Sequence, residues 1–148
     1  SEDKVKGYKH FANKLWNIAR FVLTSTEGLN LEQKPELSPT DEAYLAELST
    51  LIKETTADIE NFRFYLAAEK LYHYAWHTFA DKIIEESKKA ICGEDEKAKI
   101  STVWTLKYIL ETLLKLLHPF IPYVTEEIWH IMYAGSDKLL LVEKWPEA

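Results

Sequence analysis

Hydrophobic residues recur at helical spacing along five segments of the chain. The clearest segment, 105–117, places leucines and one isoleucine on a single wide apolar face, with lysine and glutamate side chains on the other side. Pro119 must end or kink this helix, because proline has no N–H and disfavours helical backbone at the residue before it. Pro122 suits the first turn of a following helix. The pattern therefore predicts a buried helix, a proline corner and a second helix that folds back.

Three further helices are expected earlier in the chain. The first runs from about residue 4 to 24, and the second begins after a Ser38 cap, with Pro39 at its first position and Asp41 where a capping box closes. The third runs from about residue 63 to 91 and ends at Gly93. A 100° rotation per residue gives each helix an expected core face. That of the first helix consists of Phe11, Leu15, Ile18 and Val22, and that of the third of Phe64, Ala68, Leu71, Tyr72, Ala75, Phe79 and Ile83.

The expected fold class is all-α, a mostly antiparallel bundle of about five helices in one domain. Four glycines and five prolines in 148 residues leave long helical runs uninterrupted, and 47% hydrophobic residues can fill a core. We expect burial of Trp76, Phe79, Leu110 and Leu113. The tail's Trp145 is expected to pack back on the bundle.

Composition also suggests a cellular setting. The first ten residues are too polar for a secretory signal, and no run of 18 apolar residues is present. A lone cysteine, Cys92, fits a reducing compartment. A cytoplasmic protein without a membrane partner is therefore expected.

The net charge of −6 is unevenly distributed along the chain. Residues 1–24 carry five cationic side chains against two acidic ones, whereas residues 25–60 carry nine acidic side chains against two lysines. Because a phosphate contact depends on where the charge lies, the first helix is the expected site of any such contact.

A polar stripe on the first helix has the residue types that RNA recognition requires. Cations hold phosphates, amides read base edges, and an aromatic ring can stack a base. The predicted RNA-binding residues are the stripe residues Lys9, Asn13, Asn17 and Arg20 and the flanking Lys14 and Phe21. The alternative interpretation is a solvated helix face with a peripheral phenylalanine.

No catalytic or metal-binding residues are expected in this chain. It contains neither a glycine-rich phosphate loop nor a nucleophile motif. His73, His77 and Asp81 have a spacing that could bind a metal from one helix face. The expected direction of this cluster is away from the core, and no second cysteine or further histidine lies nearby in the sequence, so no metal site is predicted.

Several strings, in this order, resemble a known family. They are FANKLWNIARFVL at 11–23, FRFYLAAEKLYHYAWHTFADKIIEESK at 62–88, TLKYILETLLKLLHPFIPYVTEEIW at 105–129 and the closing Trp145-Pro146. They are similar to the anticodon-binding helical bundle of class I aminoacyl-tRNA synthetases, most closely the valyl enzymes. One departure is Ala80-Asp81-Lys82, where valyl enzymes usually have a Cys-Asp-aromatic triplet.

The resemblance implies a function. Residues 1–148 would form a single anticodon-binding bundle taken from a larger ligase. Its partners would be valine tRNA and the catalytic domain of the same chain, and it would not bind DNA. The bundle, expected to be a monomer, would need no cofactor and would not itself be catalytic, whereas the parent enzyme would use ATP. The alternatives are the same bundle from an isoleucyl, leucyl or methionyl synthetase, and a helical interaction domain without an RNA role.

Overall fold

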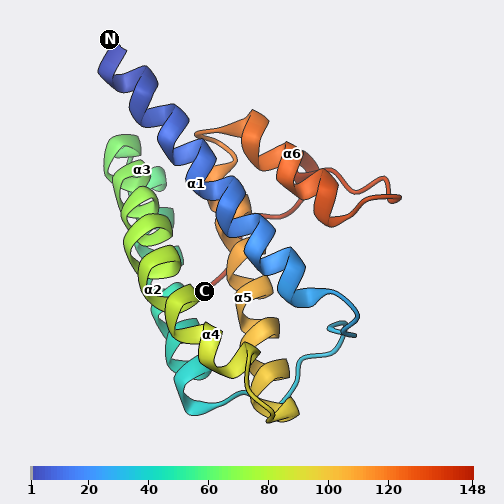
Figure 1. Cartoon of the computed structure of the whole chain (residues 1–148). Helices are drawn as coiled ribbons and strands as arrows, with labels where there is room; N and C mark the ends of the chain where they lie inside the picture. The colour runs from blue at the N-terminus through green and yellow to red at the C-terminus, as the bar shows by residue number, and fades with distance from the viewer. Residues whose placement is uncertain (1) are drawn as a thin grey trace.

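The computed structural model describes residues 2–148, except the side chains of residues 4 and 5, and contains five helical rods (Figure 1). The described residues include no β-strand. The rods and a final short 3-10 helix occur in the order α1 (Glu2–Thr26), α2 (Pro39–Glu60), a third rod made of α3 (Phe64–His73), η1 (Tyr74–Ile84) and α4 (Glu85–Ile91), then α5 (Glu96–Leu117), α6 (Pro122–Met132) and η2 (Leu140–Val142). The predicted all-α bundle is confirmed.

The start of α2 is fixed by the predicted Ser38 cap, but the capping box does not close, because the Ser38 backbone N donates to Ser101 Oγ at 2.9 Å and not to Asp41. Ser38 Oγ accepts a hydrogen bond from the Asp41 backbone N at 3.1 Å and donates one to Asp41 Oδ2 at 3.0 Å. Ser101 Oγ of α5 also donates to Asp41 Oδ2, at 2.6 Å, and Asp41 is buried. Because each of these buried polar groups has a partner, the cap also ties α2 to α5.

The proline corner lies where the sequence predicts it. Helix α5 ends at Leu117 and α6 begins at Pro122. His118 Nδ1 lies 2.9 Å from Thr125 Oγ1, which joins the two sides of the corner. The α5 residues Leu110 and Leu113 are completely buried, as expected. The corner therefore folds α6 back over a helix that forms the centre of the core.

The third rod is one continuous helical stretch, but its middle part is π-helical over Tyr74–Ile84. A π-helix closes its hydrogen bonds over five residues instead of four, so it turns by less than 100° per residue. The predicted core face assumes α-helical spacing along the whole rod. It therefore points in the wrong direction for the residues before Tyr74. This explains three wrong predictions of burial: Phe64 and Tyr72 are 51% and 43% exposed, and Ala68 is half-buried. Trp76, inside η1, is also only half-buried, so its predicted burial is wrong as well. Phe79 is completely buried, as predicted.

The tail closes the side of the bundle formed by α2, α5 and α6. Trp145 Nε1 donates a hydrogen bond to Thr56 Oγ1 of α2 at 2.9 Å, which confirms that Trp145 packs back. Leu140 of η2 is buried in the core, and Lys115 Nζ of α5 lies 3.8 Å from Glu143 Oε1. Among the described residues, no helix has the length and apolar character needed to cross a membrane.

The two ends of the bundle are formed by different helix ends and turns. At one end lie the start of α1, the turn from α2 to α3, and the corner from α5 to α6; this is the upper end in Figure 1. At the other end lie the start of α2 and the turn from α4 to α5. Helix α1 runs down from the upper end, crosses in front of α5 and ends before it reaches the lower end.

Candidate nucleic-acid interface

The outer face of α1 carries the four stripe residues. Lys9, Asn13, Asn17 and Arg20 are all exposed, whereas Leu15 and Val22 on the opposite side are completely buried. The helix phase predicted for α1 is therefore correct. Arg20 Nη1 donates a hydrogen bond to Asn17 Oδ1 at 3.3 Å, so the guanidinium and the amide one turn apart are arranged as a pair.

Lys14 faces the third rod instead of the outer stripe. Its Nζ lies 3.6 Å from Asp81 Oδ1 of η1 and 5.4 Å from the centre of the Trp76 ring. His77 Nδ1 lies 3.5 Å from the other carboxylate oxygen of Asp81. Part of the Lys14 charge is thus compensated within the protein, and this cation is less available to a phosphate than Lys9 or Arg20.

Phe21 lies at the junction of α1 and α4. It is half-buried and packs against the core, and Lys88 Nζ of α4 lies 5.8 Å from the centre of its ring. The ring therefore offers only part of its surface to a base. A nucleobase that stacked on it would also meet the Lys88 ammonium, which is itself paired with Glu85 at 2.7 Å.

The histidine cluster on the third rod is partly assembled. The rings of His73 and His77 have centroids 5.0 Å apart, and both side chains are exposed. Across residues 2–148, the structure contains no group of three or more His, Cys, Asp or Glu side chains arranged to hold a metal ion. His77 is engaged with Asp81 and thereby belongs to the border of the α1 surface.

The structure adds residues to the candidate interface that the sequence pattern did not single out for this role. Trp76, Asp81 and Lys88 come from the third rod and lie against Lys14 and Phe21. A helical-wheel argument treats one helix at a time, so it cannot find neighbours contributed by another helix. The only signal in the sequence was the family triplet that includes Asp81.

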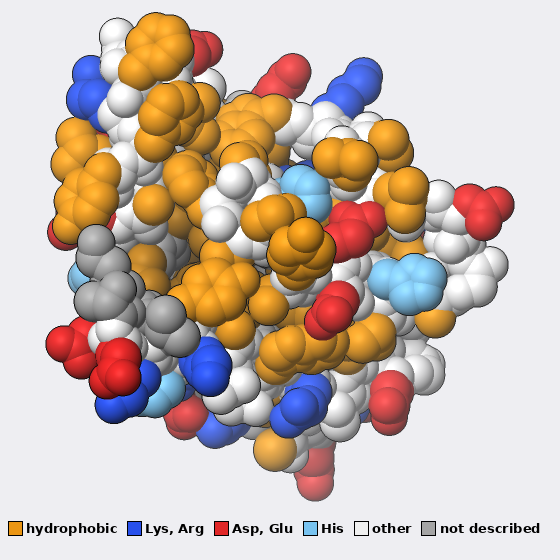
Figure 2. All heavy atoms as spheres, turned by 90° about the horizontal axis from the view of Figure 1, so that it is seen from above, with side chains coloured by type: hydrophobic (Ala, Val, Ile, Leu, Met, Phe, Trp, Pro, Cys, Tyr) orange, Lys and Arg blue, Asp and Glu red, His pale blue; other side chains and the backbone are white. Residues whose placement is uncertain are grey.

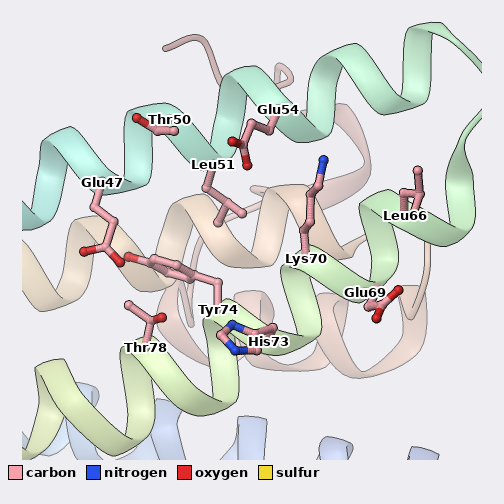
Figure 3. Close-up of a pocket in the computed structure, with 10 residues that line it drawn as sticks. All are labelled: Glu47, Thr50, Leu51, Glu54, Leu66, Glu69, Lys70, His73, Tyr74 and Thr78. Carbon is pink, nitrogen blue, oxygen red and sulfur yellow. The ribbon is translucent and has the colours of Figure 1, made fainter.

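The groove between α2 and the third rod has the opposite chemistry (Figure 3). It has a volume of about 610 Å³ and is lined by three glutamates, Glu47, Glu54 and Glu69, alongside Lys70 and His73. Figure 3 shows Tyr74 reaching from η1 across this groove towards the α2 side, where Glu47 lies. Burial, and then the charge of Glu47, raise the pKa of Tyr74, so its hydroxyl stays protonated. Carboxylates repel phosphates, and the α1 face is therefore the better RNA surface.

Comparison with known proteins assigns the chain to a family. The family described as the anticodon-binding domain of tRNA ligase matches residues 41–148, well over half of the chain. The chain belongs to this family. Its α1 stripe, at residues 9–20, lies before the matched part and is covered by the relatives that span the whole chain.

The following relatives are named valine–tRNA ligases, and two of the three span the whole chain or nearly so. The chain is 46% identical over 127 residues to the one from Xanthomonas oryzae pv. oryzae, covering 85% of the chain and 13% of the relative. It is 35% identical over 161 residues to the one from Aquifex aeolicus (99% of the chain, 14% of the relative) and 39% identical over 152 residues to the one from Bacillus licheniformis (100% and 17%). The chain thus spans less than one fifth of the length of these relatives.

Proposed function

We propose that this anticodon-binding domain belongs to a valine–tRNA ligase and holds the anticodon stem-loop of valine tRNA, so that the acceptor end reaches a catalytic domain elsewhere in the same polypeptide. The observation that carries the proposal is the similarity to valine–tRNA ligases along the whole chain. The exposed stripe of Lys9, Asn13, Asn17 and Arg20 supplies a surface that suits RNA. ATP and valine would be handled by the catalytic domain, in the cytoplasm.

The chemistry of each residue suggests a role. Arg20 presents a planar fork of donors suited to a phosphate or to a base edge. Asn17 and Asn13 lie one turn apart and offer both donors and acceptors to bases. Lys9 supplies a mobile cation for the backbone, and Phe21 a partial stacking surface beside Lys88.

Binding of a fluorescently labelled anticodon stem-loop from a valine tRNA tests the proposal. Arg20→Ala should weaken binding by about 1–3 kcal/mol if the guanidinium contacts a base, and Asn17→Ala should weaken it as well. Lys53→Ala is the matched control, because Lys53 is an exposed cation on the acidic α2. The melting temperature of each variant shows whether it remains folded.

Two outcomes would contradict the proposal. If folded Arg20→Ala binds like Lys53→Ala, the stripe does not contact the RNA. If a stem-loop from isoleucine, leucine or methionine tRNA binds more tightly than the valine one, the domain belongs to a sister enzyme.

A further inference from the structure

An apolar surface covers the end of the bundle where α1 begins. Phe62 and Tyr65 are 81% and 79% exposed, and Leu66 is exposed beside them. Figure 2 looks onto this end and shows hydrophobic side chains gathered over much of it, with charged groups between them. Soluble monomers rarely expose contiguous apolar patches of this kind, and such patches mark interaction sites. We call Phe62, Phe64, Tyr65, Leu66, Pro119 and Phe120 the end surface.

The backbone at Phe62 is strained in a way that presents the ring to solvent. Phe62 follows the last residues of α2 with φ = 60°, and it is the one non-glycine residue with positive φ in the described chain. Its backbone N donates to Ile59 O at 3.1 Å, which closes the end of α2. This position is normally occupied by glycine or asparagine, since a bulky side chain there costs about 1–2 kcal/mol. The strain is not offset by burial, so it points to a role for the exposed ring.

A hollow beside these rings can receive a side chain. It has a volume of about 580 Å³, and its walls come from the end of α2, the start of α3, the proline corner and the tail. Phe64, Phe120 and Trp145 line it, and the Phe62 and Phe64 rings meet edge to face with centroids 6.2 Å apart. Exposed rings next to an apolar hollow resemble the central part of a protein interface, where one anchor fills a pocket.

The charges of the turn from α2 to α3 do not suit RNA. The nearest cations of the turn, Arg63 and Lys70, both bind Asp58, with N–O distances of 3.1 and 2.7 Å. Asp58 is buried and holds both groups. An RNA surface needs cations that can neutralise phosphates. In the described part of the chain, the cations of the turn from α2 to α3 are thus already paired, and the rings of the end surface fit an apolar protein surface better.

We propose that the end surface is the docking site for another domain of the same polypeptide. This proposal rests on the proposed function, in which the chain is one part of a ligase. The chain spans only 13% to 17% of the relatives' length, so most of such a protein lies outside it. Helix α1 starts at this same end, so chain leading into α1 would arrive beside the end surface (Figure 1). The stripe of Lys9, Asn13, Asn17 and Arg20 runs along α1 away from this end. A domain docked on the end surface therefore leaves the outer face of α1 accessible.

Hydroxyl-radical labelling of the full-length protein, without tRNA, tests the proposal. In the domain alone Tyr65 is 79% exposed and Tyr108, halfway along α5, is 40% exposed. Docking should reverse their order, with Tyr65 and Phe62 labelled more slowly than Tyr108. Tyr65→Lys should restore fast labelling of Phe62, whereas the matched variant Tyr108→Lys should leave it slow.

Three results would overturn the proposal. Tyr65 could be labelled faster than Tyr108 in the full-length protein, which would leave the surface uncovered. Protection could appear only after tRNA is added, which would make it an RNA contact. Protection could vanish on dilution, which would indicate a second copy of the protein. All three are independent of the Arg20→Ala titration, so a failure of the proposed RNA contact can be told apart from a failure of the docking surface.

Discussion

Lys14 of α1 and Asp81 of η1 form an ion pair across two helices, with 3.6 Å between Nζ and Oδ1. The pair is largely exposed, since the side chains are 31% and 51% accessible. Its contribution to folding is therefore small, about 0–1 kcal/mol. Its greater effect is on the RNA surface, because the carboxylate competes with phosphate for the Lys14 ammonium.

Asp81→Asn should therefore strengthen RNA binding. Freeing Lys14 should increase the affinity for the anticodon stem-loop by up to about fivefold, which corresponds to about 1 kcal/mol, and should steepen its dependence on salt. Fluorescence anisotropy at several salt concentrations measures both effects. Asp137→Asn, at an exposed carboxylate in the turn after α6, is the control. A loss of affinity in Asp81→Asn would mean that Asp81 itself accepts a hydrogen bond from the RNA.

Leu113→Ala should lower the free energy of unfolding by about 2–5 kcal/mol, because it leaves a cavity at the completely buried centre of α5. Urea unfolding followed by circular dichroism measures the change. Leu141→Ala, at a residue that is 72% exposed, should change the same quantity by no more than about 0.5 kcal/mol. A cost below about 0.5 kcal/mol for Leu113→Ala would contradict the packing described for α5.

The hydrogen bond between Trp145 and Thr56 should contribute about 0.5–1.5 kcal/mol to stability. A double-mutant cycle with Trp145→Phe and Thr56→Val isolates it, since both variants keep most of the packing and remove the donor or the acceptor. Unfolding free energies of the two single variants and the double variant give the coupling. A coupling near zero would show that the tail is held by ring packing alone.

Asp58 should link stability to acid pH. A hydrogen bond from Lys70 is the largest cause that holds the pKa of Asp58 below its ordinary value of 3.8, and Arg63 adds to it. The unfolded chain therefore binds the proton first as the pH falls. The stabilisation is fully present above the ordinary value and is lost progressively as the pH falls towards the lower folded value.

Lys70→Met should raise the pKa of Asp58, as measured by an NMR titration of the side-chain carboxyl carbon. Lys88→Met is the control, because Lys88 pairs with the exposed Glu85 and not with Asp58. Equal pKa values of Asp58 in the two variants would show that Lys70 does not determine the shift.

Features fixed by local chemistry could be predicted from the sequence. The α2 cap depends on Ser38 and Asp41, and the corner depends on Pro119 and Pro122; each acts within a few residues of itself. The exposure of the α1 stripe residues could also be predicted from the sequence, because α1 is a regular α-helix. RNA contact by the stripe stays a prediction.

What could not be predicted comes from packing between helices. The π-helical turns of η1 have no marker in the sequence, and they moved Phe64 and Tyr72 out of the expected core. The neighbours of Lys14 and Phe21 come from residues about 60 positions away, which no periodicity within α1 can indicate. The strained turn at Phe62 likewise contradicts the usual preference for glycine at that position.

The small number of cations between residues 9 and 20 of α1 sets a limit on what this stretch can do alone. If Lys9, Lys14 and Arg20 each contact a phosphate of a single-stranded loop, the logarithm of the binding constant falls with the logarithm of the salt concentration with a slope of about −2. Each phosphate contact contributes about −0.7 to this slope. Such a contact is weak and easily reversed. In a longer polypeptide that holds the same tRNA elsewhere, however, the loop would be presented at a high effective concentration, because the second contact becomes intramolecular. A stripe that binds weakly, on a bundle docked against the rest of the polypeptide, would then let tRNAs bind and dissociate rapidly. Discrimination between tRNAs would come from this additional contact and not from high affinity of the domain alone.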